Sequence, residues 1–111
     1  MDIDKAISIV NDEIKYTLLS YLEYDNCFLF FIKTDWEYDD SVIIFDKNTH
    51  EVSIDTLFYL YCNNNEVAYD EREPIVINKK EVLKQKFKFY VKNLYDNIIA
   101  KLNNNYVNYE E

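Results

Sequence analysis

The chain of 111 residues contains no glycine and a single proline, Pro74. Glycine is the usual residue wherever the backbone takes a positive φ angle, and among other residues asparagine and aspartate tolerate that region best. Every tight turn is therefore expected to use Asn or Asp. The missing glycine also excludes the glycine-rich loops that cradle phosphates in nucleotide-binding proteins.

Length and composition predict a single domain that spans residues 1–111. The chain is long enough for one modest core, and 49% apolar with 17% aromatic residues excludes global disorder. Eleven residues are tyrosines, which suit core edges and interfaces because they join apolar area to a polar tip. Neither a repeat nor a linker divides the chain, and residues 104–111 are expected to form a frayed tail.

Two segments have the spacing of amphipathic helices. Residues 2–24 keep apolar side chains three and four positions apart, with Asp2 or Asp4 as the N-cap. The sequence NKKE, which begins at Asn78, has the form of a capping box and predicts a second helix to about Asn103. The apolar face predicted for this long helix consists of Leu83, Phe87, Tyr90, Val91, Leu94, Ile98 and Leu102.

The region between these helices predicts a small sheet. Residues 27–34 form an aromatic and branched run without a polar helical face, which indicates a central strand. Residues 41–46 predict a second strand, and KNTH supplies a tight turn with Asn at its centre before a short third strand at 51–55. Residues 56–62 fit either a short helix, which we prefer slightly, or a continuation of the third strand.

This order of elements predicts an α+β fold. A single small domain would combine an N-terminal helix, a two- to three-stranded antiparallel meander and a long C-terminal helix packed on one face of the sheet. Residues 63–74 are polar, acidic and irregular, and they end at the lone proline. They are expected to connect the meander to the long helix.

The net charge of −9 is unevenly distributed. Residues 1–73 contain 17 acidic and 5 basic side chains, whereas residues 74–111 contain 4 acidic and 7 basic ones. A negative body repels phosphate backbones, so no direct nucleic-acid binding is expected, and a basic protein is the favoured partner. Neither a secretory signal nor a membrane-spanning run is visible, and both cysteines, Cys27 and Cys62, have apolar neighbours. A reducing, cytoplasmic location without membrane contact is expected.

The strongest candidate site is the acidic and aromatic stretch DWEYDD between two predicted strands. Trp and Tyr are enriched among the residues that dominate interface energies, and carboxylates beside them would steer a basic partner. A solvated loop without a function is the alternative, and a calcium site is not expected because the loop lacks the glycine of such sites. The predicted partner-binding residues are Asp35, Trp36, Glu37, Tyr38, Asp39 and Asp40, followed by Glu66, Asp70 and Glu71 in a second acidic segment.

Nothing in the sequence marks a catalytic centre. His50 is the only histidine, and neither cysteine has a histidine or a second thiol at a motif spacing. No catalytic residue, metal or cofactor is therefore predicted, and the protein is expected not to be an enzyme. Lys80, Lys84, Lys88 and Lys92 form a basic stripe at a spacing of four, which is either a solvated face or a contact for an acidic partner or an RNA backbone.

At SVIIFDKNTHEV the chain resembles small bacterial immunity proteins of polymorphic-toxin and contact-dependent growth inhibition systems. Such families show an N-terminal helix, an aromatic strand and a hairpin like the one from Asp46 to Val52, and the likeness covers residues 3–54. The chain differs in having His50 where a glycine often stands and in its long C-terminal helix. The resemblance implies a cognate toxin as partner, neutralised by occlusion, but these families share no motif from which binding residues could be transferred.

The leading hypothesis is therefore an immunity or inhibitor protein that neutralises a basic toxin, such as a nuclease, by tight protein binding. One alternative is a phage-type acidic inhibitor of a host defence protein, whose carboxylates would have to line up on one surface. Another is a self-associating structural protein whose tyrosine-rich faces pair with each other.

Overall fold

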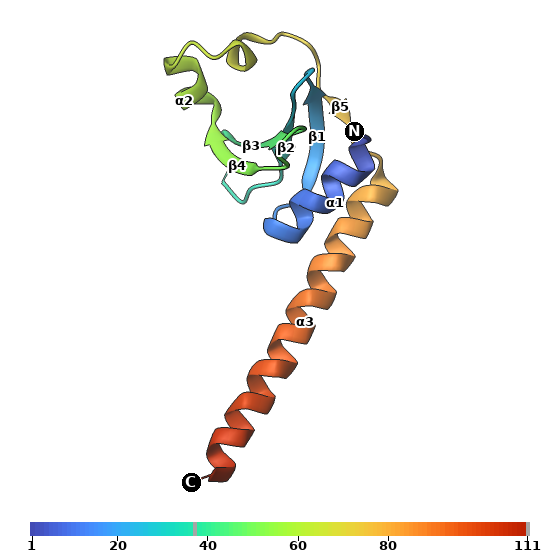
Figure 1. Cartoon of the computed structure of the whole chain (residues 1–111), viewed down its shortest axis with the longest axis vertical. Helices are drawn as coiled ribbons and strands as arrows, with labels where there is room; N and C mark the ends of the chain where they lie inside the picture. The colour runs from blue at the N-terminus through green and yellow to red at the C-terminus, as the bar shows by residue number, and fades with distance from the viewer. Residues whose placement is uncertain (37, 111) are drawn as a thin grey trace.

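The computed structural model describes the backbone of residues 1–36 and 38–110, and the side chains of these residues as far as residue 104. It has a five-stranded antiparallel sheet with helices on both faces and a long helix that projects from the body (Figure 1). The longest dimension of the molecule is about 60 Å. The elements are α1 (Ile3–Glu13), β1 (Leu18–Glu23), β2 (Cys27–Ile32), β3 (Ser41–Asp46), β4 (Val52–Thr56), α2 (Leu57–Cys62), the 3-10 helix η1 (Glu66–Tyr69), β5 (Ile75–Val76) and α3 (Lys79–Glu110).

The strand order β4-β3-β2-β1-β5 confirms the α+β fold class and the central position of β2. Neighbouring strands are antiparallel throughout, and β2 pairs with β3 from Cys27 opposite Asp46 to Phe31 opposite Val42. The sheet has five strands, whereas the sequence predicts two or three. The additional strands are β1, which lies in the stretch predicted as helix, and the two-residue β5 that follows Pro74.

The helix predicted for residues 2–24 is wrong beyond Glu13. Asp2 caps α1 as expected, because its Oδ1 accepts the Asp4 N–H at 2.7 Å, but the chain then turns into β1. The pairing of β1 with β2 shifts register between Leu18 and Ser20, as in a β-bulge. The extra residue places Leu18 and Tyr21 against the same core cluster although they are three positions apart. A bulged strand therefore produced the three-residue spacing that favoured a helix.

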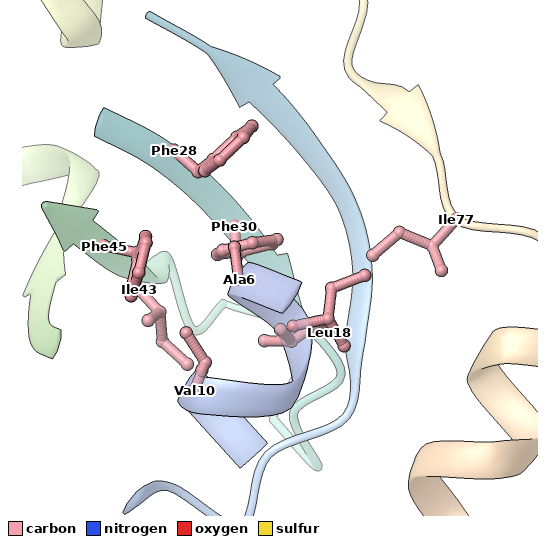
Figure 2. Packing of buried hydrophobic residues seen from close by; sticks show 9 residues of the cluster. Ala6, Val10, Leu18, Phe28, Phe30, Ile43, Phe45 and Ile77 are labelled. Carbon is pink, nitrogen blue, oxygen red and sulfur yellow. The ribbon is translucent and has the colours of Figure 1, made fainter. Parts of the chain in front are cut away.

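Both faces of the sheet are covered, whereas the sequence predicted helices on one. The side chains of β2 alternate: Phe28 and Phe30 face the cluster that contains Ala6 and Val10 of α1, as Figure 2 shows. Leu29 faces the opposite cluster with Leu22, Val42 and Leu60 of α2. Burying one such side chain contributes roughly 1.5–3 kcal/mol, so β2 is the strand that holds the two layers together.

The turns are built without glycine, as expected, and within the described residues two non-glycine positions have a positive φ. Asn64, with φ 54°, follows α2, where Asn65 N–H donates to the Leu60 carbonyl and Asn64 N–H to that of Tyr61. This pattern is the Schellman motif, with Asn in the place usually taken by glycine. In the β3–β4 turn the positive φ of 62° falls on His50, not on the asparagine at the centre of KNTH. The helix favoured for residues 56–62 is confirmed, and Thr56 caps it.

A buried glutamine attaches α3 to the sheet. Gln85 is 1% exposed, and its Nε2 donates to the Leu18 carbonyl at 3.0 Å while its Oε1 accepts the Leu18 N–H at 2.9 Å. The short β5 pairs only with Ser20 and Tyr21 of β1. The amide of Gln85 therefore continues the ladder along β1 past the point where β5 ends.

The remaining polar contacts of α3 with the body lie between its N-cap and Asp96. Asn78 Oδ1 accepts the Glu81 N–H at 2.9 Å, which confirms the predicted N-cap. Lys88 Nζ pairs with Asp12 at 2.6 Å. Lys15 reaches α3 further along, at 3.3 Å from the Asn93 side chain and 3.8 Å from Asp96.

After residue 96, α3 extends into solvent (Figure 1). The expectation that the long helix packs on one face of the sheet therefore holds only for its first turns. The backbone is helical to Glu110, where the sequence predicted a tail from residue 104. The side chains from 105 on lie outside the described residues, and the fraying expected there stays a prediction.

Replacing Gln85 with leucine should destabilise the fold by about 2–4 kcal/mol, because the N–H and carbonyl of Leu18 would both be left buried without a partner. Urea unfolding followed by circular dichroism measures this change in the free energy of unfolding. Lys84→Leu, one residue earlier and exposed, is the matched control and should change that free energy by less than about 0.5 kcal/mol. Equal stability of the two variants would contradict the ladder role of Gln85.

Candidate protein-interaction site

The loop between β2 and β3 presents two large aromatic side chains to solvent. Trp36 is 63% exposed and Tyr38 is 73% exposed, and their rings meet edge to face with centroids 5.8 Å apart. Asp35 beside them is exposed as well, whereas Glu37 lies outside the described residues. The pair offers a broad apolar surface with polar tips, which is the composition of an interface anchor.

Asp39 shapes this loop instead of facing a partner. Its Oδ1 accepts the Ser41 N–H at 2.9 Å, and its own N–H donates to the Trp36 carbonyl at 3.1 Å. The Thr34 hydroxyl donates to the same carbonyl at 3.1 Å. Hydrogen bonds from Ser41, through its side chain and its backbone, hold the pKa of Asp39 below its ordinary value. The carboxylate of Asp39 is therefore engaged in positioning the aromatic pair.

Asp40 links the loop to α2. Its carbonyl accepts the Leu57 N–H at 3.1 Å, and its Oδ2 accepts the Phe58 N–H at 2.9 Å. A carboxylate at the N-terminus of a helix satisfies a free backbone donor and complements the helix dipole. These bonds bring Phe58, which is 71% exposed, next to the loop. Phe58 could not be predicted as part of the site, because the side of α2 that faces solvent is decided by the burial of Leu60.

The second acidic segment lies at the other end of the sheet. It crosses near the turn between β1 and β2, while the aromatic loop follows the opposite end of β2 (Figure 1). Glu66 and Glu71 are exposed, but Asp70 is engaged. Its Oδ2 accepts the Tyr24 hydroxyl at 2.8 Å and lies 2.6 Å from the Arg72 guanidinium. The structure therefore does not bring the two predicted segments together.

The contacts of Asp70 with Tyr24 and Arg72 shift the pKa values of all three side chains. Hydrogen bonds from the side chain and backbone of Arg72 hold the pKa of Asp70 well below its usual range, and Asp70 in turn raises the pKa of Arg72. Burial and the hydrogen bond to Asp70 raise the pKa of Tyr24 to about 12. Asp70 thus fixes the segment before β5 to the body.

An open cleft of about 540 Å³ adjoins the aromatic loop. Lysines from three separate elements line it together with side chains of the loop, so it carries both signs of charge beside an aromatic wall. Its lining consists of Lys15, Tyr16, Thr17, Lys33, Thr34, Asp35, Trp36, Asp39 and Lys86. No sequence spacing connects these lysines, which only the fold brings together.

A second exposed surface lies on α3 and is larger than the loop. Its apolar side chains are 38–68% exposed and occupy about half of the helix circumference. Val82, Gln85 and Phe89, which are less exposed, lie on the opposite half. The α3 face, as we name it, consists of Leu83, Phe87, Tyr90, Val91, Leu94, Tyr95, Ile98, Ile99 and Leu102. Helical spacing predicted seven of these residues, but not that they face away from the body.

The residues whose side chains could bind a metal or take part in catalysis are scattered over the structure. No group of three or more His, Cys, Asp or Glu side chains that could hold a metal is found within the described ranges. Cys27 and Cys62 are free thiols, and burial raises the pKa of Cys27. His50 is exposed and stacks on Phe45 with ring centroids 5.6 Å apart.

No helix in the described part of the chain combines the length and the apolar character needed to cross a bilayer. No protein-family model, curated protein or solved structure matches this chain. A function has to be inferred from the surfaces described above.

The cluster of Tyr24, Asp70 and Arg72 should make stability depend on pH at both ends of the scale. The folded-state pKa of Asp70 lies below its unfolded value of about 3.9, so its contribution is full above that pH and is lost progressively in more acidic solution. The pKa of Tyr24 is raised, so its contribution is full below about pH 10 and is lost as the pH rises toward 12.

Tyr24→Phe should therefore flatten the alkaline loss of stability, and Asp70→Asn should flatten the acid loss. Urea-unfolding curves recorded across the pH range measure both effects. Tyr16→Phe, at an exposed tyrosine outside the cluster, is the control and should leave the alkaline limb unchanged. An alkaline limb that is the same in Tyr24→Phe and in the unaltered protein would contradict the assignment.

Proposed function

We propose that this protein is an inhibitor of the immunity type, which neutralises a basic toxin in the cytoplasm by binding it and blocking its working surface. The observation that carries the proposal is the aromatic pair of Trp36 and Tyr38, exposed on a loop of an acidic body. Net charge of −9 attracts a basic protein over a distance, and the aromatic pair supplies the area that holds it after contact.

The loop is organised before any partner arrives. Asp39 and Asp40 fix its backbone through hydrogen bonds to Ser41 and to the first turn of α2. Preorganisation of this kind strengthens binding because less conformational freedom is lost on association. These two carboxylates thus act through the position of Trp36, and Asp35 is the described carboxylate of the loop that steers a basic partner.

Phe58 extends the surface onto α2. Its backbone N–H is bonded to Asp40 and its side chain is exposed, so it continues the apolar area beyond the loop. A binding centre in which aromatic side chains are surrounded by polar groups is the usual organisation of a tight protein interface. The cleft beside Trp36 would receive side chains from the rim of the partner.

The alternative of a phage-type inhibitor that imitates nucleic acid receives less support. Such a protein needs carboxylates in a row on one surface, and the two acidic segments lie at opposite ends of the sheet (Figure 1). Several carboxylates are also engaged with backbone N–H groups, as at Asp39 and Asp46.

Trp36→Ala and Tyr38→Ala should each weaken binding to a basic toxin domain from the same genome by about 30-fold or more, equivalent to about 2 kcal/mol, because each removes one ring of the exposed aromatic pair. Isothermal titration calorimetry measures the affinity, and survival of cells that express the toxin domain measures protection. Tyr69→Ala, at a tyrosine of η1 that is 53% exposed, is the matched control and should change affinity less than about 3-fold.

Two results would count against the proposal in different ways. Unchanged affinity in both loop variants would remove the loop as the centre of binding. Failure of the unaltered protein to bind the basic toxin domains of the same genome, or to protect cells against them, would remove the inhibitor function itself.

A further inference from the structure

The α3 face is too large to belong to an ordinary monomer surface. At roughly 100 Å² of exposed surface per side chain, its nine residues present on the order of 900 Å². The largest apolar patch on a typical monomeric protein is about 300–600 Å², whereas each partner in a stable interface contributes about 800 Å². The α3 face thus has the area of one half of an interface.

The far part of α3 also lacks support from its own chain. The last described contact with the body is the one between Lys15 and Asp96, and the helix continues for fourteen residues after it. Five of these fourteen are asparagine, a poor helix former, and isolated helices of this length are marginal in water. Packing against another element would stabilise this part of α3.

We propose that the α3 face pairs with the α3 face of a second copy in an antiparallel arrangement. The two-fold axis passes between the two helices, at the height along α3 that lies midway between Lys92 and Asn93. The positions of the apolar residues are symmetric about this point. In an antiparallel pair centred there, residues whose numbers add up to 185 lie level with each other. The level pairs are Leu83 with Leu102, Phe87 with Ile98, Tyr90 with Tyr95 and Val91 with Leu94.

Eight of the nine residues of the α3 face therefore lie level with another member of the face, as a two-fold interface requires. Ile99, at the margin of the face, lies level with Lys86, which faces the cleft beside Trp36 and does not belong to the α3 face. The face runs from residue 83 to residue 102, about 28 Å at 1.5 Å per residue, so the whole length would be buried.

Charge favours the antiparallel orientation over the parallel one. Residues 79–95 of α3 contain six lysines and one glutamate, whereas residues 96–110 contain one lysine, one aspartate and one glutamate. A parallel pair would place the two basic halves side by side. An antiparallel pair places each basic half along the nearly neutral half of the other copy, where Lys84 lies level with the single lysine of that half, Lys101.

The oligomeric state tests the proposal. Sedimentation equilibrium at about 20 µM should give the mass of two copies, and Leu94→Lys should raise the dissociation constant at least about 100-fold because it buries a charge at the centre of the pair. Ala100→Lys introduces the same side chain on the opposite side of α3 and should leave the dimer intact. A monomer, or an assembly of more than two copies, would overturn the proposal for the unaltered protein.

Cross-linking tests the orientation. In a background with Cys27→Ala and Cys62→Ser, proteins carrying Phe87→Cys and Ile98→Cys are mixed and oxidised. The antiparallel pair predicts the mixed disulfide between the two variants, whereas a parallel pair predicts a disulfide of Phe87→Cys with itself. The second result would overturn the proposed arrangement.

The dimer and the proposed inhibitor function fail separately. Leu94→Lys is not expected to change the affinity for the toxin domain, and Trp36→Ala is not expected to change the mass of the dimer.

Discussion

The pair of hydrogen bonds between Gln85 and the backbone of Leu18 determines where α3 lies. A side-chain amide carries a donor and an acceptor in the arrangement of a peptide unit, so Gln85 occupies the edge of β1 where β5 has ended. Both groups are buried, and leaving them unpaired would cost far more than a surface contact provides. By comparison, the ion pair of Lys88 with Asp12 is exposed and contributes little. The rotation of α3 about its own axis, and with it the direction of the α3 face, follows from this one attachment.

Much of the negative charge of the protein has a structural role, because aspartate side chains accept backbone N–H groups at helix starts and turns. Asp2 caps α1, and Asp40 caps α2 from the neighbouring loop. Asp46 accepts the N–H groups of the next turn, at 2.8 Å and 2.9 Å, and Asp70 holds the segment before β5. A carboxylate that accepts backbone N–H groups stabilises a turn or a helix start without glycine. The carboxylates left to steer a partner are therefore fewer than the net charge suggests.

The sequence predicted those parts of the fold that local chemistry decides. The central strand, the β3–β4 hairpin, the helix after Thr56 and the cap at Asn78 each depend on a few neighbouring residues. After Glu13 the helical spacing continues although the structure forms a strand, because a β-bulge places Leu18 and Tyr21 on one face of β1. In the candidate site the exposure of Trp36 and Tyr38 agrees with the expectation, but the structural use of Asp39, Asp40 and Asp70 depends on contacts with residues that the loop alone does not reveal.

The apolar side of α3 shows why periodicity alone could not decide how the helix packs. A helical stripe indicates that something apolar covers it, without indicating whether the cover comes from the same chain. Here Val82 packs against the core beside the polar contact of Gln85, whereas the nine apolar side chains of the α3 face point to solvent. Since α1 covers one face of the sheet and α2 the other, Val82 is the one residue of α3 that joins either core cluster in the described part of the chain. A cover from a second molecule is the arrangement that uses both the attachment of Gln85 and the symmetric spacing from Leu83 to Leu102.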